Sequence, residues 1–230
     1  MPELVLWDID HTLMATRGLG RELWAQAFHE VTGIEMREQA SVTGSTERVI
    51  LRETARLHDI TYSDELFESF AAALGAVHVR RAAELRERGH ALPGAAAVLA
   101  RLADKGVRQT VVTGNVRAAA EVKLAVFGLD GYLRLEDGAY AEDGEERPEL
   151  LRAALARSAT RPDKAAFLGD TPADVEGGLG AGVRVVAVAT GRTSATELRG
   201  SGADTVLEGL ADTEKAFAAI SCARTGGVAG

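Results

Sequence analysis

Five short apolar runs, separated by segments of helical periodicity, constrain the fold of this chain more than any other feature. The runs are rich in β-branched residues or leucine and lie at 4–7, 109–112, 165–168, 183–188 and 205–207. Continuous apolar runs of this length are typical of strands buried on both faces. Helix-period segments follow at 95–103, 117–127, 149–157 and 210–220. This alternation predicts an α/β fold with a doubly wound parallel sheet.

Residues 16–92 interrupt the alternation, because they contain Ala/Arg/Glu/Leu-rich helical stretches and almost no strand-like run. We expect an inserted all-helical unit at 16–92, a Rossmann-like core formed by 1–15 and 93–220, and a flexible tail at 221–230. Gly18 and Gly20 precede the insertion and Pro93-Gly94 follows it. These residues suit hinges, and they equally suit ordinary turns.

Charge and composition exclude several classes of partner. The 230 residues carry a net charge of −8 without a basic block, which argues against nucleic acid or an anionic membrane as a partner. No apolar run approaches the roughly 20 residues of a membrane span, and the first residues lack a basic, apolar leader. A single cysteine excludes an internal disulfide. We expect a soluble, cytoplasmic protein, either a monomer or a homodimer.

The first candidate site is the acid pair Asp8 and Asp10, directly after the first apolar run. Ligands of parallel sheets bind at the carboxyl ends of the strands. Two carboxylates two residues apart in extended chain point the same way and repel each other unless a cation lies between them or one is protonated. The alternative interpretation is a solvated, Asp-rich turn.

A second acid pair, Asp170 and Asp174, follows a later apolar run. Thr171 and Pro172 are typical of a helix N-cap and first helical residue, so both carboxylates can face one point above the sheet. Capping explains Thr171 and Pro172 but not both acids. Carboxylate oxygens of this kind are suited to Mg²⁺, with water and phosphate as its remaining ligands.

A third strand end carries Thr113, Gly114 and Asn115, directly before a helical segment. A hydroxyl and free backbone N–H groups at a helix N-terminus can hold an anion. Asn115 can also be a simple helix cap.

Together these segments resemble the haloacid dehalogenase-like hydrolase superfamily. Asp8, Asp10 and Thr12 fit its first motif, D-x-D-x-[TV], and Thr113 fits its second. The run from Gly169 to Asp174 fits its fourth, G-D-x-x-x-D. A helical insertion between the first two motifs is similar to the α-helical cap of the branch that contains phosphoglycolate phosphatases, and the resemblance covers about residues 3 to 210.

The resemblance implies a phosphatase that acts on a small phosphorylated metabolite through an aspartyl-phosphate. Asp8 would be the nucleophile and Asp10 the general acid and base, with Asp10 kept neutral by the adjacent Asp8 charge. The implied cofactor is Mg²⁺, held by Asp8, the Asp10 backbone carbonyl and Asp170, with Asp174 acting through water.

The same resemblance assigns the transferring phosphoryl group to the Thr113 hydroxyl and the Gly114 N–H, with Asn115 beside them. A loop at 43–46 corresponds to the cap loop that faces the active site, so Ser45, Thr46 and Arg48 are candidate substrate contacts. Alternatively, Ser45 or Thr46 only caps a helix over 47–57.

Two positions depart from the family pattern. The third motif normally supplies a Lys, and Glu145 stands in that register, whereas Arg147 lies two residues later. Arg147 either neutralises the nucleophile and a phosphoryl oxygen or is a solvated helix-start charge. If it is the latter, Lys123 or Arg192 are other sources of the balancing cation. His11 replaces the usual Gly, and we expect it to adopt an unusual backbone angle.

Three other functions remain open. A phosphomutase would share the same chemistry. A dehalogenase is disfavoured because halide leaves without a proton, so the acid at Asp10 would have no use. A catalytically silent Mg²⁺ and phosphate-binding domain is suggested only by the missing Lys.

Overall fold

The structure is a computed structural model that describes residues 1–41 and 43–222. Its strands are β1 (Leu4–Trp7), β2 (Met14–Ala15), β3 (His90–Ala91), β4 (Arg108–Val111), β5 (Ala165–Gly169), β6 (Arg184–Val188) and β7 (Thr205–Leu207). Its helices are α1 (Leu19–Thr32), α2 (Glu47–Leu57), α3 (Asp64–Arg80), α4 (Ala82–Arg88), α5 (Ala95–Asp104), α6 (Arg117–Val126), α7 (Arg147–Arg157), α8 (Pro172–Gly180), α9 (Ala195–Gly200) and α10 (Thr213–Ser221). Short 3₁₀ turns lie at Asp130–Tyr132, Leu135–Asp137 and Pro162–Lys164.

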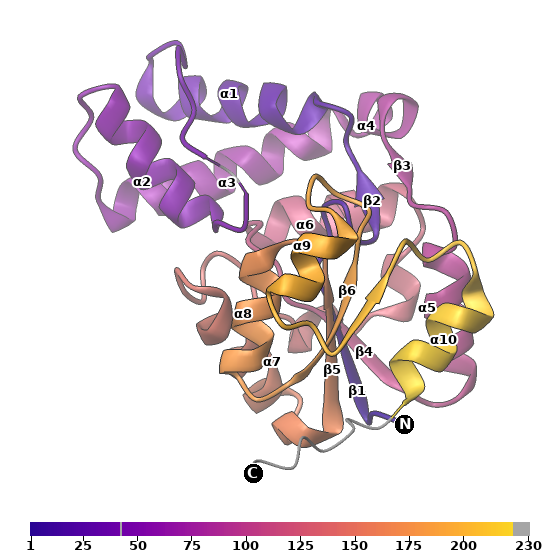
Figure 1. The fold of residues 1–230 in the computed structure, drawn as a ribbon. Helices are drawn as coiled ribbons and strands as arrows, with labels where there is room; N and C mark the ends of the chain where they lie inside the picture. Colours follow the sequence, from indigo (N-terminus) through magenta and orange to yellow (C-terminus); the bar gives the residue numbers. More distant parts are fainter. Residues whose placement is uncertain (42, 223–230) are drawn as a thin grey trace.

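A five-stranded sheet in the order β4-β1-β5-β6-β7 forms the centre of the molecule, and all of its strand pairs are parallel (Figure 1). In register, Trp7 at the end of β1 lies beside Val111 of β4 and Leu168 of β5. The carboxyl ends of these strands therefore lie at the same edge of the sheet. The predicted α/β fold with a parallel sheet is confirmed.

Helices cover both faces of the sheet, and the alternation of side chains along β1 shows why. Val5 and Trp7 pack in the cluster that contains the apolar residues of α5, α6 and α10, whereas Leu4 and Leu6 pack with those of α7. On β6, Val185 joins the residues of α8 and α9 on this second face. A strand buried on both faces is apolar at most of its positions, which is the sequence signal that predicts β1.

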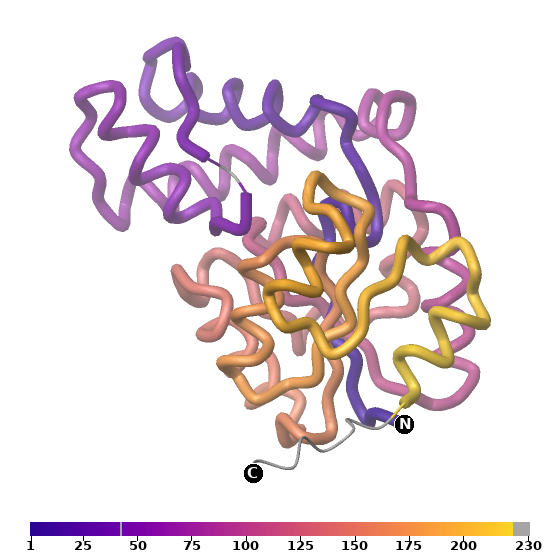
Figure 2. The backbone as a smooth tube through the Cα atoms, in the orientation of Figure 1, coloured from indigo at the N-terminus to yellow at the C-terminus, as the bar shows by residue number. Residues whose placement is uncertain are grey.

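Four helices, α1 to α4, occupy the segment between β2 and β3 and lie over the carboxyl ends of the strands (Figure 1). We call them the cap helices. β2 and β3 pair antiparallel, so the two connections between the cap helices and the sheet run together (Figure 2). The insertion is helical as expected, and the domain boundaries at 15/16 and 92/93 stay a prediction.

Two helices that border these connections begin after glycines in the left-handed conformation. Gly18 precedes α1 with a φ of 89°, and Gly94 precedes α5 with a φ of 85°. Both are therefore turn residues, and a hinge at either place stays a prediction. The expected tail at 221–230 lies outside the described residues except for 221 and 222. Ser221 is the last residue of α10.

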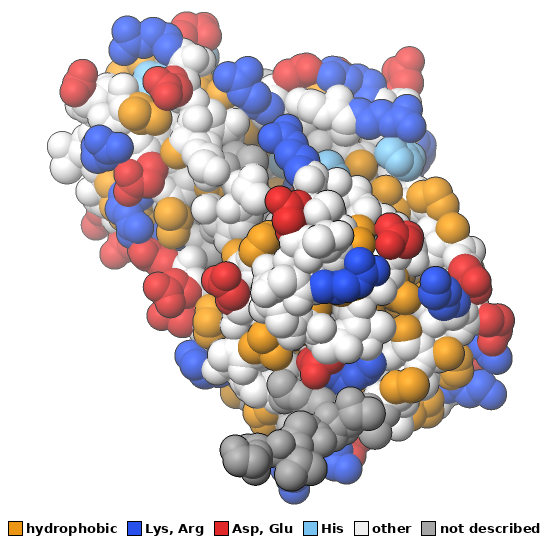
Figure 3. Space-filling model, viewed as in Figure 1, with side chains coloured by type: hydrophobic (Ala, Val, Ile, Leu, Met, Phe, Trp, Pro, Cys, Tyr) orange, Lys and Arg blue, Asp and Glu red, His pale blue; other side chains and the backbone are white. Residues whose placement is uncertain are grey.

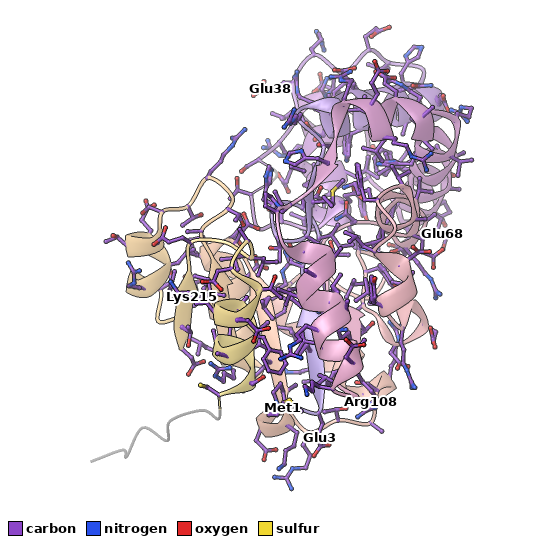
Figure 4. The ribbon with its side chains drawn as sticks, turned by 90° about the vertical axis from the view of Figure 1, so that its right-hand side faces the viewer. Met1, Glu3, Glu38, Glu68, Arg108 and Lys215 are labelled. Atoms are coloured by element: carbon purple, nitrogen blue, oxygen red, sulfur yellow. The ribbon has the colours of Figure 1, made fainter. Side chains whose placement is uncertain are left out.

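The surface mixes charges of both signs over the cap helices and the sheet domain on the face drawn in Figure 3. In the side view, Glu68 marks cap helix α3 and Glu38 the segment between α1 and α2, whereas Met1, Glu3 and Arg108 lie at the opposite end, where the strands begin (Figure 4). Among the described residues, no helix has both the length and the apolar character that crossing a membrane requires.

Gly94 provides a test of how the chain returns to the sheet. A Cβ there would lie 1.9 Å from the Leu210 carbonyl oxygen. Gly106 also has a positive φ, 72°, but a Cβ there would meet no atom within 4 Å. We expect Gly106→Ala to cost about 1 kcal/mol of unfolding free energy from backbone strain alone. Gly94→Ala should cost at least about 3 kcal/mol, because the backbone must also shift. Urea unfolding measures both, and equal losses would contradict this packing.

Candidate active site

The end of β1 lies where the winding of the sheet reverses. The chain passes from β1 to β4 on one side and afterwards to β5 on the other. In open parallel sheets, ligands bind outside the carboxyl ends of the strands at this reversal point. Asp8 follows β1 directly, is 6% exposed, and donates its backbone N–H to the Leu168 carbonyl at 2.8 Å. The topology alone therefore makes Asp8 the central candidate.

Two further carboxylates meet Asp8. Asp170 follows β5, and Asp174 lies in the first turn of α8. One oxygen of each of the three carboxylates lies within 4.8 Å of the others, and all three residues are buried. The Thr12 hydroxyl donates to Asp170 Oδ1 at 3.3 Å. We call Asp8, Asp170 and Asp174 the acid cluster.

The two oxygens of Asp174 have different partners. Asp174 Oδ2 accepts from the backbone N–H of Thr171 at 3.1 Å and from its hydroxyl at 2.7 Å. Asp174 thus completes the cap of α8, a role that the sequence analysis gave only to Thr171 and Pro172. Asp174 Oδ1 is buried without a hydrogen bond in the described structure, and it lies 2.8 Å from Arg147 Nε as an ion pair.

Arg147 is the cation of the acid cluster. It begins α7, and the Glu149 carboxylate fixes that start by accepting from the backbone N–H groups of Glu145 and Glu146. Arg147 is 8% exposed, and its Nη1 lies 3.7 Å from Asp8 Oδ1. The interpretation of Arg147 as a solvated helix-start charge is therefore wrong.

One guanidinium does not balance three buried carboxylates. Burial, followed by the charge of Asp174, raises the pKa of Asp8 well above its usual value, although Arg147 opposes the shift. The same two causes raise the pKa of Asp170 to about 7. A divalent cation between these oxygens would remove the repulsion, and oxygen ligands of this kind are those that Mg²⁺ prefers.

Asp10 lies in a different electrostatic environment, although it is only two residues from Asp8. Its carboxylate accepts from Lys123 Nζ at 2.8 and 3.0 Å and from Asn115 Nδ2 at 2.8 Å. Burial opposes ionisation of Asp10, but Lys123 and Asn115 outweigh it, so the pKa of Asp10 is lowered. The expectation that the Asp8 charge keeps Asp10 neutral is wrong for this arrangement.

Asn115 links Asp10 to the second motif. Its side chain donates to Thr113 Oγ1 at 2.6 Å and accepts from Lys123 Nζ at 2.5 Å. Val116, not Asn115, is the N-cap of α6. The alternative of Asn115 as a simple helix cap is therefore wrong, and Asn115 instead holds Thr113 and Asp10 together.

The loop at 43–46 packs directly on the second motif. A Cβ on Gly114 would lie 2.6 Å from the Ser45 carbonyl oxygen, so only glycine permits this approach. Ser45 lines the cavity described below, whereas the Thr46 hydroxyl accepts from the Val49 N–H and caps α2. The capping alternative thus holds for Thr46.

Arg48 does not reach this site. Its Nη1 pairs with Asp64 Oδ1 at 2.8 Å, and its guanidinium lies 4.0 Å from the centre of the Phe67 ring. It is not among the residues that line the cavity. The structure therefore brings together all of the predicted site residues except Thr46 and Arg48.

A cavity of about 400 Å³ lies between the acid cluster and the cap helices. Its lining includes Asp8, Asp10, Thr113 and Arg147 from the sheet side. From the cap helices it is lined by Trp24, Glu47 and His78. None of these three residues was among those predicted from the sequence. Their sequence contexts are those of ordinary buried helical residues, so no local signal separates them from the core.

His11 adopts the left-handed conformation, with a φ of 60°. The prediction of an unusual backbone angle is confirmed. Its carbonyl accepts from the Thr190 hydroxyl at 2.5 Å, which ties the first motif to the loop after β6.

Glu47 connects the cap helices to the site. Its backbone N–H donates to the Gly114 carbonyl at 2.7 Å, and its Oε2 accepts from the Val116 N–H at 2.6 Å. Burial raises the pKa of Glu47 to about 7, although Lys123 and the Val116 N–H oppose the shift. Glu47, a residue of the cap helices, thus accepts a hydrogen bond from the backbone N–H group at the start of α6.

Glu47 should make stability depend on pH. Between about pH 4.5 and 7 the folded protein retains a proton that the unfolded chain releases, so the Glu47 contribution is present at low pH and is lost as pH rises. Glu47→Gln removes this titration and keeps an acceptor for Val116. From pH 5 to pH 8, wild type should lose on the order of 2 kcal/mol of unfolding free energy relative to the variant. If the unfolding free energies of wild type and Glu47→Gln, measured with urea, change equally with pH, this prediction is contradicted. Glu53→Gln on the same helix is the control.

Comparisons with known proteins agree with this geometry. The sequence model of the haloacid dehalogenase-like hydrolase family matches residues 2–182. A phosphoglycolate phosphatase of Nitrosococcus oceani is 24% identical over 214 residues, which cover 91% of this chain and 93% of that protein. A hydrolase structure from Pseudomonas syringae superposes with a TM-score of 0.71 at 19% identity, covering 96% of this chain and 100% of the other. A putative β-phosphoglucomutase from Bacteroides vulgatus gives 0.69 at 20% identity, covering 98% and 91%.

Proposed function

Because this chain belongs to the haloacid dehalogenase-like hydrolases, we propose that it hydrolyses small phosphate monoesters, with Asp8 as the nucleophile and Mg²⁺ as the cofactor. The observation that carries the proposal is the burial of the acid cluster with Arg147 at the reversal point of the sheet. Two curated relatives named phosphoglycolate phosphatase, at 24% and 26% identity, support a phosphatase within the family.

The residues present fit a magnesium ion. The donors are all carboxylate oxygens, and Asp174 Oδ1 is buried without a hydrogen bond among the described residues, although it forms an ion pair with Arg147 Nε at 2.8 Å. Asp8 and Asp170 would bind the metal with the Asp10 backbone carbonyl, and Asp174 would act through water. When bound, Mg²⁺ would neutralise the acid cluster and the phosphoryl oxygens.

Asp8 would attack phosphorus, forming the aspartyl-phosphate as the ester bond to the leaving oxygen breaks. The Thr113 hydroxyl and Gly114 N–H would hold the transferring group, and Arg147 would neutralise one of its oxygens. Water would then cleave the aspartyl-phosphate and restore Asp8. The buried Arg147, with Nη1 3.7 Å from Asp8 Oδ1, supports turnover over a catalytically silent domain, which was suggested only by the missing Lys.

The leaving alkoxide needs one proton, and Asp10 with Lys123 can supply it. Asp10 is ionised in this arrangement, so the transferable proton resides on Lys123 Nζ, 2.8 Å from Asp10 Oδ2. The proton would pass from Lys123 through Asp10 to the alkoxide, and Asp10 would accept one from the attacking water afterwards. A dehalogenase needs no such relay, whereas a phosphomutase would use it with a second substrate hydroxyl in place of water.

The decisive assay measures phosphate released from para-nitrophenyl phosphate. Wild type should be active with Mg²⁺, inactive after complete chelation, and inhibited by Ca²⁺, which occupies carboxylates at longer distances. Asp8→Asn should lose at least 10³-fold in kcat while keeping the circular dichroism spectrum of wild type. Full turnover without metal, or a few per cent of activity in a pure Asp8→Asn sample, would overturn the proposal. Phosphoryl transfer to an added sugar phosphate, without release of phosphate, would favour a mutase.

Arg147 can be tested by graded replacement. Arg147→Ala should lower kcat/KM on the order of 10²-fold, because the transition-state charge and Asp8 lose their buried partner. Arg147→Lys should retain more activity than Arg147→Ala, because it restores the charge without the second donor. Arg152→Ala is the control, as Arg152 is exposed on the same helix. If both Arg147 variants match wild type, Arg147 has only a structural role.

A further inference from the structure

On the cap side of the cavity, two lining residues each carry a buried polar atom that lacks a hydrogen-bond partner in the described part of the chain. The two atoms are Trp24 Nε1 on α1 and His78 Nε2 on α3. Both residues line the cavity, and they are only 4% and 2% exposed. A buried polar atom without a partner is costly, and in functional sites its partner is often the ligand.

The chemistry of His78 Nε2 is fixed by the other ring nitrogen. Nδ1 lies 2.8 Å from the Leu74 carbonyl oxygen, which can only accept, so Nδ1 carries the proton. Burial, with the nearby Lys123 charge, lowers the pKa of His78 to about 4, so the ring is neutral. Nε2 therefore carries a lone pair, on a residue that lines the cavity, and needs a donor.

Trp24 presents the opposite requirement. Its indole N–H can only donate. The ring is fixed in place, because its centre lies 5.7 Å from that of Phe28 and 4.7 Å from that of Phe70. The cap wall thus holds one rigid donor and one rigid acceptor, in the same cavity as Asp8 and Thr113.

We propose that Trp24 and His78 form a subsite for hydroxyl groups, which makes the substrates phosphate esters of a hydroxylated carbon chain, a polyol or a sugar. This inference rests on the proposed function, which places the phosphoryl group at Asp8 and leaves the cap side of the cavity for the leaving group. A hydroxyl both donates and accepts, so a hydroxylated chain satisfies His78 and Trp24.

Other substituents satisfy only one of the two residues. A carboxylate or a second phosphate offers acceptors to Trp24 but faces the His78 lone pair without a donor. A plain alkyl chain leaves both atoms unpaired. Sites built to hydrogen-bond a hydroxyl discriminate strongly against analogues that lack it. Phosphoglycolate, the substrate after which two relatives are named, carries a carboxylate and is disfavoured here.

The test compares matched pairs of esters: glycerol 3-phosphate with propyl phosphate, and ribitol 5-phosphate with pentyl phosphate. For each pair, the measured quantity is kcat/KM for the hydroxylated ester divided by kcat/KM for the alkyl ester. Wild type should give a ratio of at least tenfold for one pair, and 2-phosphoglycolate should be turned over less well than the preferred hydroxylated ester.

Variants of Trp24 and His78 test whether these two side chains cause the preference for the hydroxylated ester. Trp24→Phe removes the N–H and keeps an aromatic ring, whereas His78→Leu removes the acceptor. Each should lower the ratio several-fold, and the double variant should bring it close to one. His78→Gln retains an acceptor oxygen and should restore part of the ratio. Val77→Ala, a buried change beside His78 at a residue that does not line the cavity, should keep the wild-type ratio.

Binding separates failure of the subsite from failure of the proposed function. Calorimetric Kd values for the same pairs, measured on Asp8→Asn protein, should show the same preference without turnover. Ratios near one for both pairs, in kcat/KM and in Kd, would overturn the subsite even if para-nitrophenyl phosphate is hydrolysed. A wild-type protein that hydrolyses no ester but binds the hydroxylated ones tenfold more tightly would overturn the function and uphold the subsite.

Discussion

The burial of three carboxylates around one guanidinium is the constraint on which the rest of the site depends. Asp8, Asp170 and Asp174 repel one another in a place that water does not screen, and the charge of Arg147 opposes this repulsion. Each carboxylate is held by local structure that the repulsion cannot easily displace: a strand end for Asp8, the Thr12 hydroxyl for Asp170, and a helix cap for Asp174. The fold therefore maintains a concentration of negative charge that a divalent cation would stabilise.

The cap helices are joined to this site by backbone contacts as well as by the connecting strands. The Glu47 N–H and carboxylate bind the Gly114 carbonyl and the Val116 N–H, so the start of α2 and the start of α6 satisfy each other. Gly114 permits this contact because it has no side chain. Any movement of α2 away from α6 must break these bonds beside Thr113 and Asn115, which couples the position of the cap helices to the order of the loop at 113–115.

The sequence predicts what local patterns determine and misses what distant residues determine. The strands are predictable because most positions of a strand buried on both faces are apolar, and the left-handed His11 follows from its place in the first motif. Asp10 was expected to be neutral because only Asp8 is near it in sequence, whereas Lys123, 113 residues away, controls it. Arg48 resembled a substrate contact from its place after the cap loop, but Asp64 and Phe67 engage it.

Asp8 and Asp10 show how two identical side chains two residues apart acquire different chemistry. Their side chains enter different networks, with other carboxylates around Asp8 and an ammonium with an amide around Asp10. The pKa of the first is raised and that of the second is lowered, and such divergence is how enzymes assign separate roles to paired acids. A cation beside Asp8 would favour its ionised form, whereas Lys123 already favours the ionised form of Asp10. In the proposed mechanism a metal and the lysine would therefore act on different halves of one motif.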